Sequence, residues 1–237
     1  MNRFFLLPVL LVFFVSAYAQ QSSYKNLNSQ EFSKIIQDSK GTLLDVRTPS
    51  EFANSHIANA GQLNYYAFDF EQKLLLLPKN QPVYLYCNTG YRSKRAAEIL
   101  TKNGYTQVYN LEKGIMDWNL YNFPVAVEPN AQPDTDNKME PDEFFALIKS
   151  NKPVFVDFYA PWCAPCRKMM PMMDSLKEEY KGKITVVKIN ADASKKLIKE
   201  LQLGSVPYLV LYQRGKKTFE HKGIISRSEL ENQFTRK

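Results

Sequence analysis

The chain has 237 residues, of which 44% are hydrophobic, and its 31 Lys and Arg residues against 24 Asp and Glu residues give a formal net charge of +7. This length suffices for one large or two ordinary domains, each with its own core. The basic residues are spread along the chain without a run interleaved with aromatic side chains, which argues against nucleic acid as a partner.

The first nineteen residues have the pattern of a secretory signal. Arg3 gives a positive start, residues 4–15 are apolar, and Ala17-Tyr18-Ala19 is a small-x-small cleavage pattern. The apolar stretch is too short to span a bilayer comfortably, so we predict cleavage before Gln20, with an uncleaved anchor as the alternative. We therefore expect an exported protein, soluble in the bacterial periplasm. In an oxidising compartment, three cysteines leave one thiol without an intramolecular partner.

The chain after the signal alternates helices with strands. Asn28 and Glu31 form a capping pattern for the first helix. The elements expected after it are strand 42–47, a helix from Pro49, a helix within 70–77, strand 83–86, helix 93–103, strand 108–111 and helix 114–120. This alternation predicts an α/β domain with a mainly parallel sheet, in which reactive groups gather beyond the carboxyl ends of the strands. Asp45, Arg47 and Cys87 lie at such ends.

Four motifs follow one another within this first domain, residues 20–127. They are Leu44-Asp45-Val46-Arg47, then Glu51-Phe52 with His56-Ile57, then Cys87-x-x-Gly90-x-Arg92-Ser93, and finally segment 110–118. Together they resemble the rhodanese family, although Ser55 and Lys113 stand where that family usually has glycine. The resemblance implies a sulfurtransferase that carries sulfur as a persulfide on Cys87. Its donor is expected to be a small sulfur compound such as thiosulfate or a persulfide.

The loop that follows Cys87 is suited to holding a sulfur anion. Backbone N–H groups between Cys87 and Arg92, with Gly90 in the turn, can form a nest, and both the nest and Arg92 lower the pKa of the thiol. We expect Asp45 and Arg47 to brace this loop from the neighbouring strand, and a surface ion pair is the alternative. The alternative for Cys87 is a buried, inert cysteine.

Residues 128–137 contain two prolines and three acidic residues without apolar periodicity, which predicts a flexible linker. A second domain is expected over residues 138–237. Its predicted elements are helix 139–149, strand 153–159, a helix that opens at the Cys-x-x-Cys motif and ends near Tyr180, strand 184–190, helix 194–201, hairpin 208–213 with 216–221, and a closing helix capped by Ser226 and Glu229. No internal repeat links the halves.

Cys163 and Cys166 form a Cys-x-x-Cys motif at the start of a predicted helix. Unpaired N–H groups and the helix dipole stabilise a thiolate there, so Cys163 is the predicted attacking sulfur and Cys166, one turn further, the resolving one. The same motif could be half of a zinc site. With three cysteines and two histidines in the chain, a second ligand pair is missing, and we expect neither a metal nor a cofactor.

The residues around this motif resemble thioredoxin over roughly the last hundred residues. The resemblance rests on Trp162, Pro165 and Pro171, on the loop 204–207, on Asp157 and Lys188, and on Gly223. It implies a thioredoxin fold with a mixed central sheet and a redox-active disulfide between Cys163 and Cys166.

The resemblance also implies roles for the flanking residues. Val206 and Pro207, in a cis-proline loop, bind an extended substrate strand, and Trp162 shields the disulfide unless it is simply an exposed aromatic. Asp157, whose pKa burial would raise, takes the proton of Cys166, and Lys188 moderates its charge. A solvent-facing acid is the alternative for Asp157.

We therefore predict an exported thiol-disulfide oxidoreductase, acting mainly as a reductase, coupled to a sulfurtransferase that uses a Cys87 persulfide. In the alternative, the first domain is a non-catalytic docking or regulatory module. The expected partners are protein disulfides, a membrane electron donor and the small sulfur donor. A metal-binding or structural protein is the third possibility.

Overall fold

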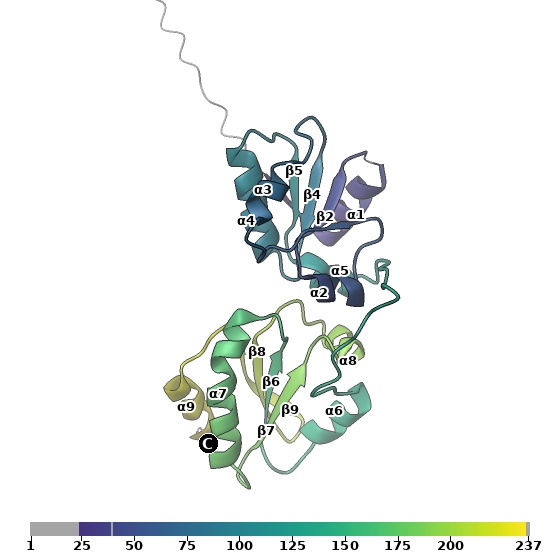
Figure 1. Ribbon diagram of the computed structural model, residues 1–237. Helices are drawn as coiled ribbons and strands as arrows, with labels where there is room; N and C mark the ends of the chain where they lie inside the picture. Colours follow the sequence, from purple (N-terminus) through teal and green to yellow (C-terminus); the bar gives the residue numbers. More distant parts are fainter. Residues whose placement is uncertain (1–23, 39, 236–237) are drawn as a thin grey trace, which may run out of the picture.

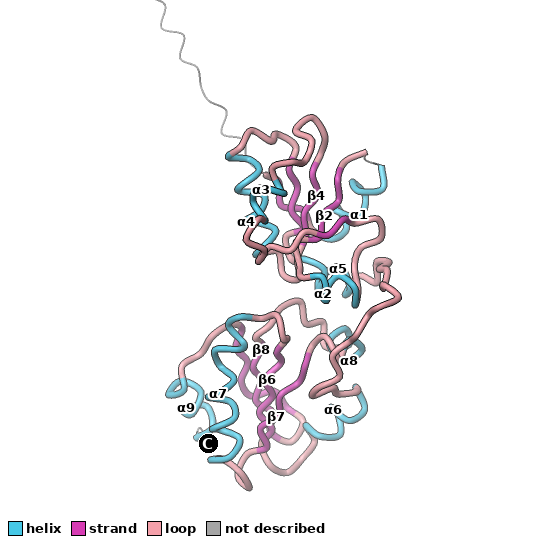
Figure 2. The backbone as a smooth tube through the Cα atoms, in the orientation of Figure 1, coloured by secondary structure: helices cyan, strands magenta, loops and turns pink. Residues whose placement is uncertain are grey.

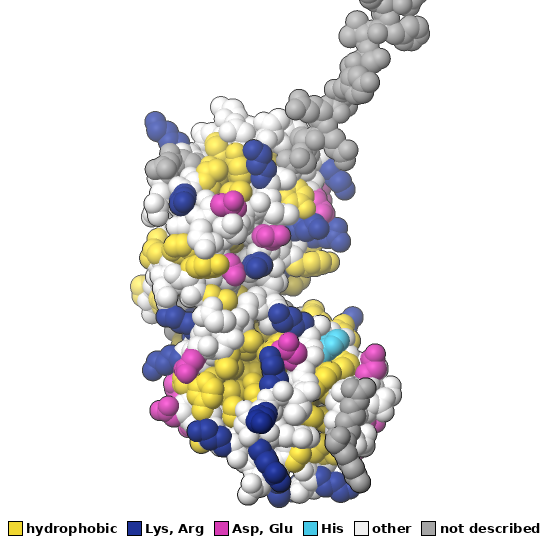
Figure 3. Space-filling view, turned by 180° about the vertical axis from the view of Figure 1, so that it is seen from behind, with side chains coloured by type: hydrophobic (Ala, Val, Ile, Leu, Met, Phe, Trp, Pro, Cys, Tyr) yellow, Lys and Arg dark blue, Asp and Glu magenta, His cyan; other side chains and the backbone are white. Residues whose placement is uncertain are grey.

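The computed structural model describes residues 24–38 and 40–235, which fold as two α/β domains in succession along the chain (Figure 1). The predicted signal at residues 1–19 lies outside the described residues, so export stays a prediction. None of the helices within the described ranges is long and apolar enough to cross a membrane. On the face seen in Figure 3, basic and acidic side chains are scattered over both domains.

The first domain is built on a five-stranded parallel sheet with the strand order β1-β5-β4-β2-β3. The strands are β1 (Lys25–Leu27), β2 (Thr42–Asp45), β3 (Gly61–Gln62), β4 (Val83–Tyr86) and β5 (Val108–Leu111). The predicted parallel sheet is confirmed. The two edge strands, β1 and β3, were not predicted because two or three residues are too few to show a period of two.

The helices of this domain are α1 (Ser29–Asp38), α2 (Pro49–Asn54), α3 (Phe70–Leu74), α4 (Tyr91–Lys102) and α5 (Gly114–Leu120). Helices α3 and α4 lie on one face of the sheet, α1 and α5 on the other, and α2 lies at the end that faces the second domain (Figure 1). Side chains of β4 alternate between the faces, as a strand requires. Val83 and Leu85 pack with the core residues of α3 and α4, whereas Tyr84 and Tyr86 pack with those of α1 and α5. Both ends of β4 are thus fixed in a fully buried layer, and Cys87 follows directly.

The second domain has a four-stranded mixed sheet with the order β7-β6-β8-β9, in which only β6 and β7 are parallel. The strands are β6 (Val154–Tyr159), β7 (Thr185–Asn190), β8 (Tyr208–Gln213) and β9 (Lys216–Lys222), and the helices are α6 (Pro141–Ile148), α7 (Ala164–Glu179), α8 (Lys195–Glu200) and α9 (Arg227–Thr235). Helices α7 and α9 lie on one face and α6 and α8 on the other (Figure 1). The predicted mixed sheet is confirmed.

Two of the predicted helix caps are present atom for atom. The Asn28 side chain accepts a hydrogen bond from the Glu31 N–H at 2.9 Å, and Glu31 accepts one from the Asn28 N–H at 3.1 Å. Ser226 and Glu229 pair in the same reciprocal way at the start of α9. Each pair satisfies N–H groups that a helix start leaves unbonded.

The two domains are packed against each other. Met116 of α5 is 9% exposed and belongs to the core cluster of the second domain, beside α6 and α8. The segment 128–137 runs between the domains without helix or strand (Figure 2). Asn54 exchanges two hydrogen bonds with the Gln132 backbone, at 2.8 and 3.2 Å, and Asn190 donates to Asp134 at 2.9 Å. The segment predicted as a flexible linker is therefore held at both sides.

Candidate active site

Cys163 and Cys166 are joined by a disulfide at the start of α7. Cys163 is the N-cap residue, and its Sγ atom accepts a hydrogen bond from the Cys166 N–H at 3.2 Å. The side chains are 3% and 1% exposed, respectively. The helix N-terminus favours negative charge at Cys163, so in the reduced state the pKa of this thiol is expected to lie below its ordinary value.

Asp157 lies inside β6, the strand that leads to this disulfide, and is 1% exposed. Neither of its carboxyl oxygens has a hydrogen-bond partner among the residues that the structure describes. Burial raises the pKa of Asp157 to about 7, against a smaller opposing effect of Lys188. Lys188 stands next to Asp157 in the β6–β7 register but pairs with Asp174 on α7. The strand that leads to the disulfide thus carries a buried acid that can take up or release a proton near neutral pH.

Trp162 packs against the disulfide, and its ring is half-buried. Its indole Nε1–H donates to Asp192 Oδ2 at 2.8 Å. Burial raises the pKa of Asp192, while the hydrogen bond from Trp162 opposes that rise. Asp192 was not predicted as a site residue, because it reaches Trp162 from beyond the end of β7. The hydrogen bond fixes the plane of the indole beside Cys163.

Cys87 is 1% exposed at the carboxyl end of β4, where the loop to α4 begins. Its Sγ atom accepts a hydrogen bond from the Ser93 hydroxyl at 3.5 Å. Gly90 turns the loop with φ +84°, and a Cβ atom there would lie 1.8 Å from the Glu112 carbonyl oxygen. Only glycine fits so close to another backbone segment. Within the described residues, the N–H groups of residues 88–93 donate to no backbone carbonyl, so they are available to an anion.

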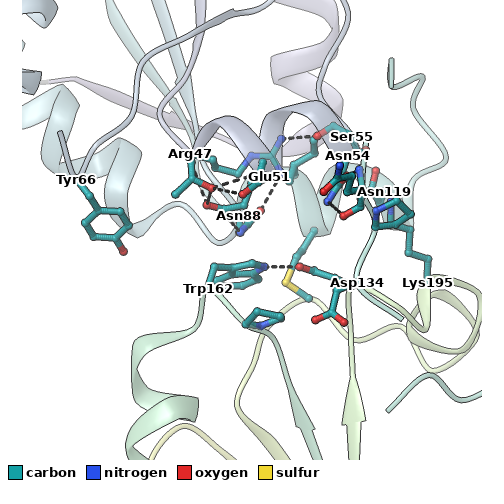
Figure 4. A pocket seen from close by; sticks show the side chains of 18 of the residues that line it. Arg47, Glu51, Asn54, Ser55, Tyr66, Asn88, Asn119, Asp134, Trp162 and Lys195 are labelled. Carbon is teal, nitrogen blue, oxygen red and sulfur yellow. Dashed lines mark hydrogen bonds between the residues drawn. The ribbon is translucent and has the colours of Figure 1, made fainter. Parts of the chain in front are cut away.

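Asp45 and Arg47 are buried, at 0% and 4% exposure, so the alternative of a surface ion pair is wrong. The Arg47 Nη2 and Asp45 Oδ2 atoms are 2.6 Å apart. Arg47 also donates from Nη1 to the side-chain oxygen of Asn88, the residue after Cys87, at 3.1 Å. Figure 4 shows Arg47 and Asn88 pointing toward one another on the side that faces Trp162. The pair therefore ties the Cys87 loop to the end of β2.

Arg92 is held by Glu51, a residue that the sequence motifs contain but that we had not assigned to the site. The two make a bidentate pair, with Nη2–Oε1 at 2.7 Å and Nη1–Oε2 at 3.0 Å. Burial tends to lower the pKa of Arg92, but the hydrogen bonds and charge of Glu51 outweigh it and raise the pKa overall. Conversely, burial tends to raise the pKa of Glu51, while Arg92 and Thr48 lower it. Both side chains are thus charged and neutralise each other.

The two sulfur centres open into one chamber of about 400 Å³ between the domains. The lining residues of the first domain are Tyr66, Cys87, Thr89, Tyr91 and Arg92, and those of the second are Trp162, Cys163, Ala164, Pro165 and Val206. A neighbouring pocket of about 430 Å³, shown in Figure 4, also has Tyr66 and Trp162 in its wall. Cys87 and Cys163 therefore share a small, partly enclosed space.

Several predicted residues lie behind this chamber rather than in its wall. Asp45, Asp157, Cys166 and Pro207 are buried, Lys188 is partly exposed and paired with Asp174, and the peptide bond before Pro207 is in the cis form, as expected. Gly90 shapes the loop. Tyr66 was missed because a tyrosine in an irregular segment has no sequence signature.

Among the described residues, no group of three or more His, Cys, Asp and Glu side chains could hold a metal ion.

Comparisons with known proteins divide the chain in the same way. The family model of the rhodanese-like domain matches residues 28–121, and that of thioredoxin matches residues 136–236. The domain order expected from the sequence is thereby confirmed.

The proteins similar to this chain include several thioredoxins. Thioredoxin of Porphyra purpurea is 40% identical over 86 residues, a match that covers 36% of this chain and 80% of the relative. Thioredoxin 1 of a Nostoc strain is 37% identical over 84 residues, covering 35% of this chain and 78% of the relative. Among solved structures, the oxidised form of mitochondrial thioredoxin 3 from Saccharomyces cerevisiae shares 33% identity, covering 40% of this chain and 90% of its own, with a TM-score of 0.37.

Proposed function

The chain belongs to the thioredoxin family and carries a rhodanese-like domain before its thioredoxin domain, and on this premise we propose that it reduces a persulfide formed on Cys87 and releases sulfide. The thioredoxin-like domain is a thiol-disulfide oxidoreductase module. In the proposed reaction the rhodanese-like domain is the sulfur carrier, and the Cys163–Cys166 pair is the reductant.

The observation that supports this proposal is the shared chamber. Cys87 and Cys163 lie on different domains, yet both are in the wall of one space of about 400 Å³. A sulfur atom added to Cys87 would extend into this space, toward the second domain. Two reactive groups held in one enclosed site gain the proximity that makes a second step effectively unimolecular.

In the first step, the Cys87 thiolate takes a sulfur atom from a donor. The thiolate attacks the transferable sulfur, the donor's sulfur bond breaks, and the donor leaves with the electron pair. Cys87 then carries Cys–S–S⁻, whose charge the N–H groups of residues 88–93 can stabilise. The Ser93 hydroxyl, 3.5 Å from the Cys87 sulfur, is a further donor.

In the second step, the Cys163 thiolate attacks the outer sulfur of the persulfide and Cys87 leaves as a thiolate. Cys163 now carries the extra sulfur, and the Cys166 thiolate attacks the Cys163 sulfur to expel HS⁻. The products are sulfide and the Cys163–Cys166 disulfide, so the dithiol supplies both electrons. Asp157, with a pKa of about 7, accepts the Cys166 proton. An external dithiol must then reduce the disulfide, and for an exported protein we propose a membrane electron donor.

The test is a single turnover of the reduced, full-length protein without added thiol. With one equivalent of glutathione hydropersulfide, the wild-type protein should release one equivalent of sulfide and form the disulfide. Cys163→Ser should release none and should accumulate one extra sulfur atom on Cys87, measured by mass spectrometry. Cys87→Ser should slow sulfide release strongly. If either variant releases sulfide at the wild-type rate, the two domains do not act jointly.

A second function is favoured by the burial of Cys163, which is only 3% exposed. A first domain that covers the redox site could act as a regulatory module that controls access of protein disulfides. In that case Cys163→Ser would trap no persulfide on Cys87. Separating the domains, for example with Met116→Asp in the packed contact, would raise the rate at which the protein reduces insulin.

A further inference from the structure

We propose that the sulfur donor of Cys87 is a hydropersulfide or polysulfide, R–S–S⁻ or its protonated form, and that the chamber discriminates against the thiosulfate dianion. This inference deepens the proposed function and rests on it. It follows from the way in which the charges around Cys87 are paired and from the walls of the chamber.

The Arg92 guanidinium, in the chamber wall, is already paired with the Glu51 carboxylate. Arg92 is the only charged residue among those that line the chamber, and both of its Nη atoms donate to Glu51, at 2.7 and 3.0 Å. The two side chains are 7% and 9% exposed. To hold an oxyanion, Arg92 would have to leave Glu51, and Glu51 would remain as a buried charge without its partner.

The other polar side chains around the Cys87 loop also have partners within the protein. Arg47 is paired with Asp45, and Asn88 uses both ends of its amide, accepting from Arg47 at 3.1 Å and donating to Glu51 at 2.5 Å. The two arginines and the two carboxylates sum to zero charge. Arg95, beside the Tyr91 ring, is paired with Glu98 at 3.0 Å. The donors still available to an anion are the backbone N–H groups of the Cys87 loop. They are suited to a single negatively charged sulfur atom.

The chamber wall is largely aromatic and aliphatic. It contains the rings of Tyr66, Tyr91 and Trp162 together with Pro165 and Val206. The thiosulfate dianion would lose hydration against these side chains without gaining a cation in return. A sulfur–sulfur group is polarisable and packs well on aromatic rings. The environment thus favours the less charged donor.

The leaving groups reinforce this difference. When Cys87 takes the outer sulfur of R–S–SH, the S–S bond breaks and R–S⁻ departs with the electron pair and takes up the proton. The sulfur moves without any outside oxidant or reductant. When Cys87 takes the outer sulfur of thiosulfate, sulfite departs with two negative charges. No free cation in the wall of this chamber, as far as the structure describes it, would stabilise that dianion as it forms.

The experiment uses full-length Cys163→Ser protein, in which sulfur added to Cys87 stays there. The rate at which Cys87 gains one sulfur atom is measured by mass spectrometry with cysteine hydropersulfide, whose ammonium and carboxylate cancel, and with thiosulfate. Because the two donors differ in intrinsic reactivity, the decisive comparison adds Thr89→Lys, which places an unpaired cation in the chamber wall, and the neutral control Thr89→Gln. Thr89→Lys should raise the ratio of the thiosulfate rate to the hydropersulfide rate about tenfold, because the added cation acts more strongly on the dianion. Thr89→Gln should leave that ratio as it is in Cys163→Ser.

Three results would overturn the inference. The first is loading of Cys87 by thiosulfate as fast as by the hydropersulfide. The second is a failure of Thr89→Lys to raise the ratio of the two rates in a protein that the hydropersulfide still loads. Each of these leaves the proposed function standing. The third is a failure of both donors to load Cys87, which overturns the proposed function and this inference together.

Discussion

The two sulfur centres are built on the same local plan but differ in how they treat charge. Both cysteines stand where a buried strand passes into a helix, so both face backbone N–H groups. Around Cys87, every charged side chain in contact with the loop is paired. In the second domain, Asp157 lies in the strand that leads to the Cys163–Cys166 pair and is buried without a hydrogen-bond partner among the described residues. The difference matches the proposed roles, because a sulfur carrier needs a fixed anion site, whereas a resolving thiol needs a proton acceptor.

The largest expected effect comes from Gly90→Ala, which removes the fixed anion site. The added Cβ would meet the Glu112 carbonyl oxygen at 1.8 Å in a backbone with φ +84°, so the loop must move. We expect a loss of stability of roughly 3 kcal/mol or more and no persulfide on Cys87. Urea unfolding and mass spectrometry measure the two effects.

Gly104→Ala is the matched control. Gly104 has the same φ of +84°, but a Cβ atom there would meet nothing within 4 Å. Gly104→Ala should lower the free energy of unfolding by only about 1 kcal/mol and leave the loading of Cys87 with sulfur intact. If both variants lose the same stability and loading, the cause is the left-handed backbone conformation and not the close approach of residue 90 to Glu112.

Glu51→Gln breaks the charge balance around Cys87 by leaving Arg92 buried without a counter-charge. We expect destabilisation of about 3–5 kcal/mol near neutral pH. Because the folded-state pKa of Glu51 is lowered, its contribution to stability is full above the unfolded-state pKa and is lost as the pH falls through the folded-state pKa. The deficit of the variant should therefore shrink in acid, as measured by urea unfolding at several pH values.

Glu98→Gln tests the same kind of pair at the surface. Arg95 and Glu98 lie 3.0 Å apart, but Arg95 is 51% exposed. The expected loss is about 0–1 kcal/mol. A loss as large as that of Glu51→Gln would contradict the distinction between the two pairs.

Asp157→Asn addresses the second centre. The pKa of Asp157 is raised to about 7 from 3.8, so the folded chain binds this proton more tightly than the unfolded chain. Stability from this group is present at low pH and falls as the pH rises from about 4 to 7. Asp157→Asn should therefore stabilise the protein at pH 8, on the order of 3 kcal/mol, while slowing release of sulfide by Cys166.

The pH profile of sulfide release separates catalysis from stability. In the wild-type protein, the resolving step should rise with pH around a midpoint near 7, and Asp157→Asn should remove that rise. Asp174→Asn, which removes the exposed partner of Lys188, should keep the rise but move its midpoint to lower pH, because the charge of Asp174 contributes to the raised pKa of Asp157. An unchanged midpoint in Asp157→Asn would exclude this carboxyl as the proton acceptor.

Among the variants at the two sulfur centres, Trp162→Phe has the smallest expected effect. The variant keeps an aromatic ring over the disulfide but loses the 2.8 Å hydrogen bond to Asp192. We expect a loss of about 1 kcal/mol in the free energy of unfolding. Asp192→Asn keeps an oxygen acceptor for the indole and should cost less. The reverse order would mean that the charge of Asp192, rather than the hydrogen bond, positions the ring.

The sequence predicted those features that depend on spacing along the chain. The Cys-x-x-Cys pair, the parallel strands β2, β4 and β5, and the caps at Asn28 and Ser226 all follow from local patterns, and the structure shows each of them. Features that depend on distant segments were missed. Glu51 reaches Arg92 across 41 positions and Asp192 reaches Trp162 across 30, and no periodicity encodes such pairs.

The chamber itself belongs to this second kind. In the sequence, Cys87 and Cys163 lie in different predicted domains on either side of the predicted flexible linker 128–137. In the structure they share a chamber wall because α5 packs on the second domain and the segment 128–137 is hydrogen-bonded to both sides. The two cysteines come together because the domains pack against each other. Such packing depends on the shapes of side chains, which sequence motifs do not reveal.

The position of Met116 has a consequence for how the molecule comes apart. A side chain that belongs to one half of the chain but fills the interior of the other links their folding, so each half severed at residue 128 would expose an apolar hollow or an unmatched methionine. Assays on separated halves would then report on damaged surfaces, and heat should melt the intact molecule in a single transition rather than two.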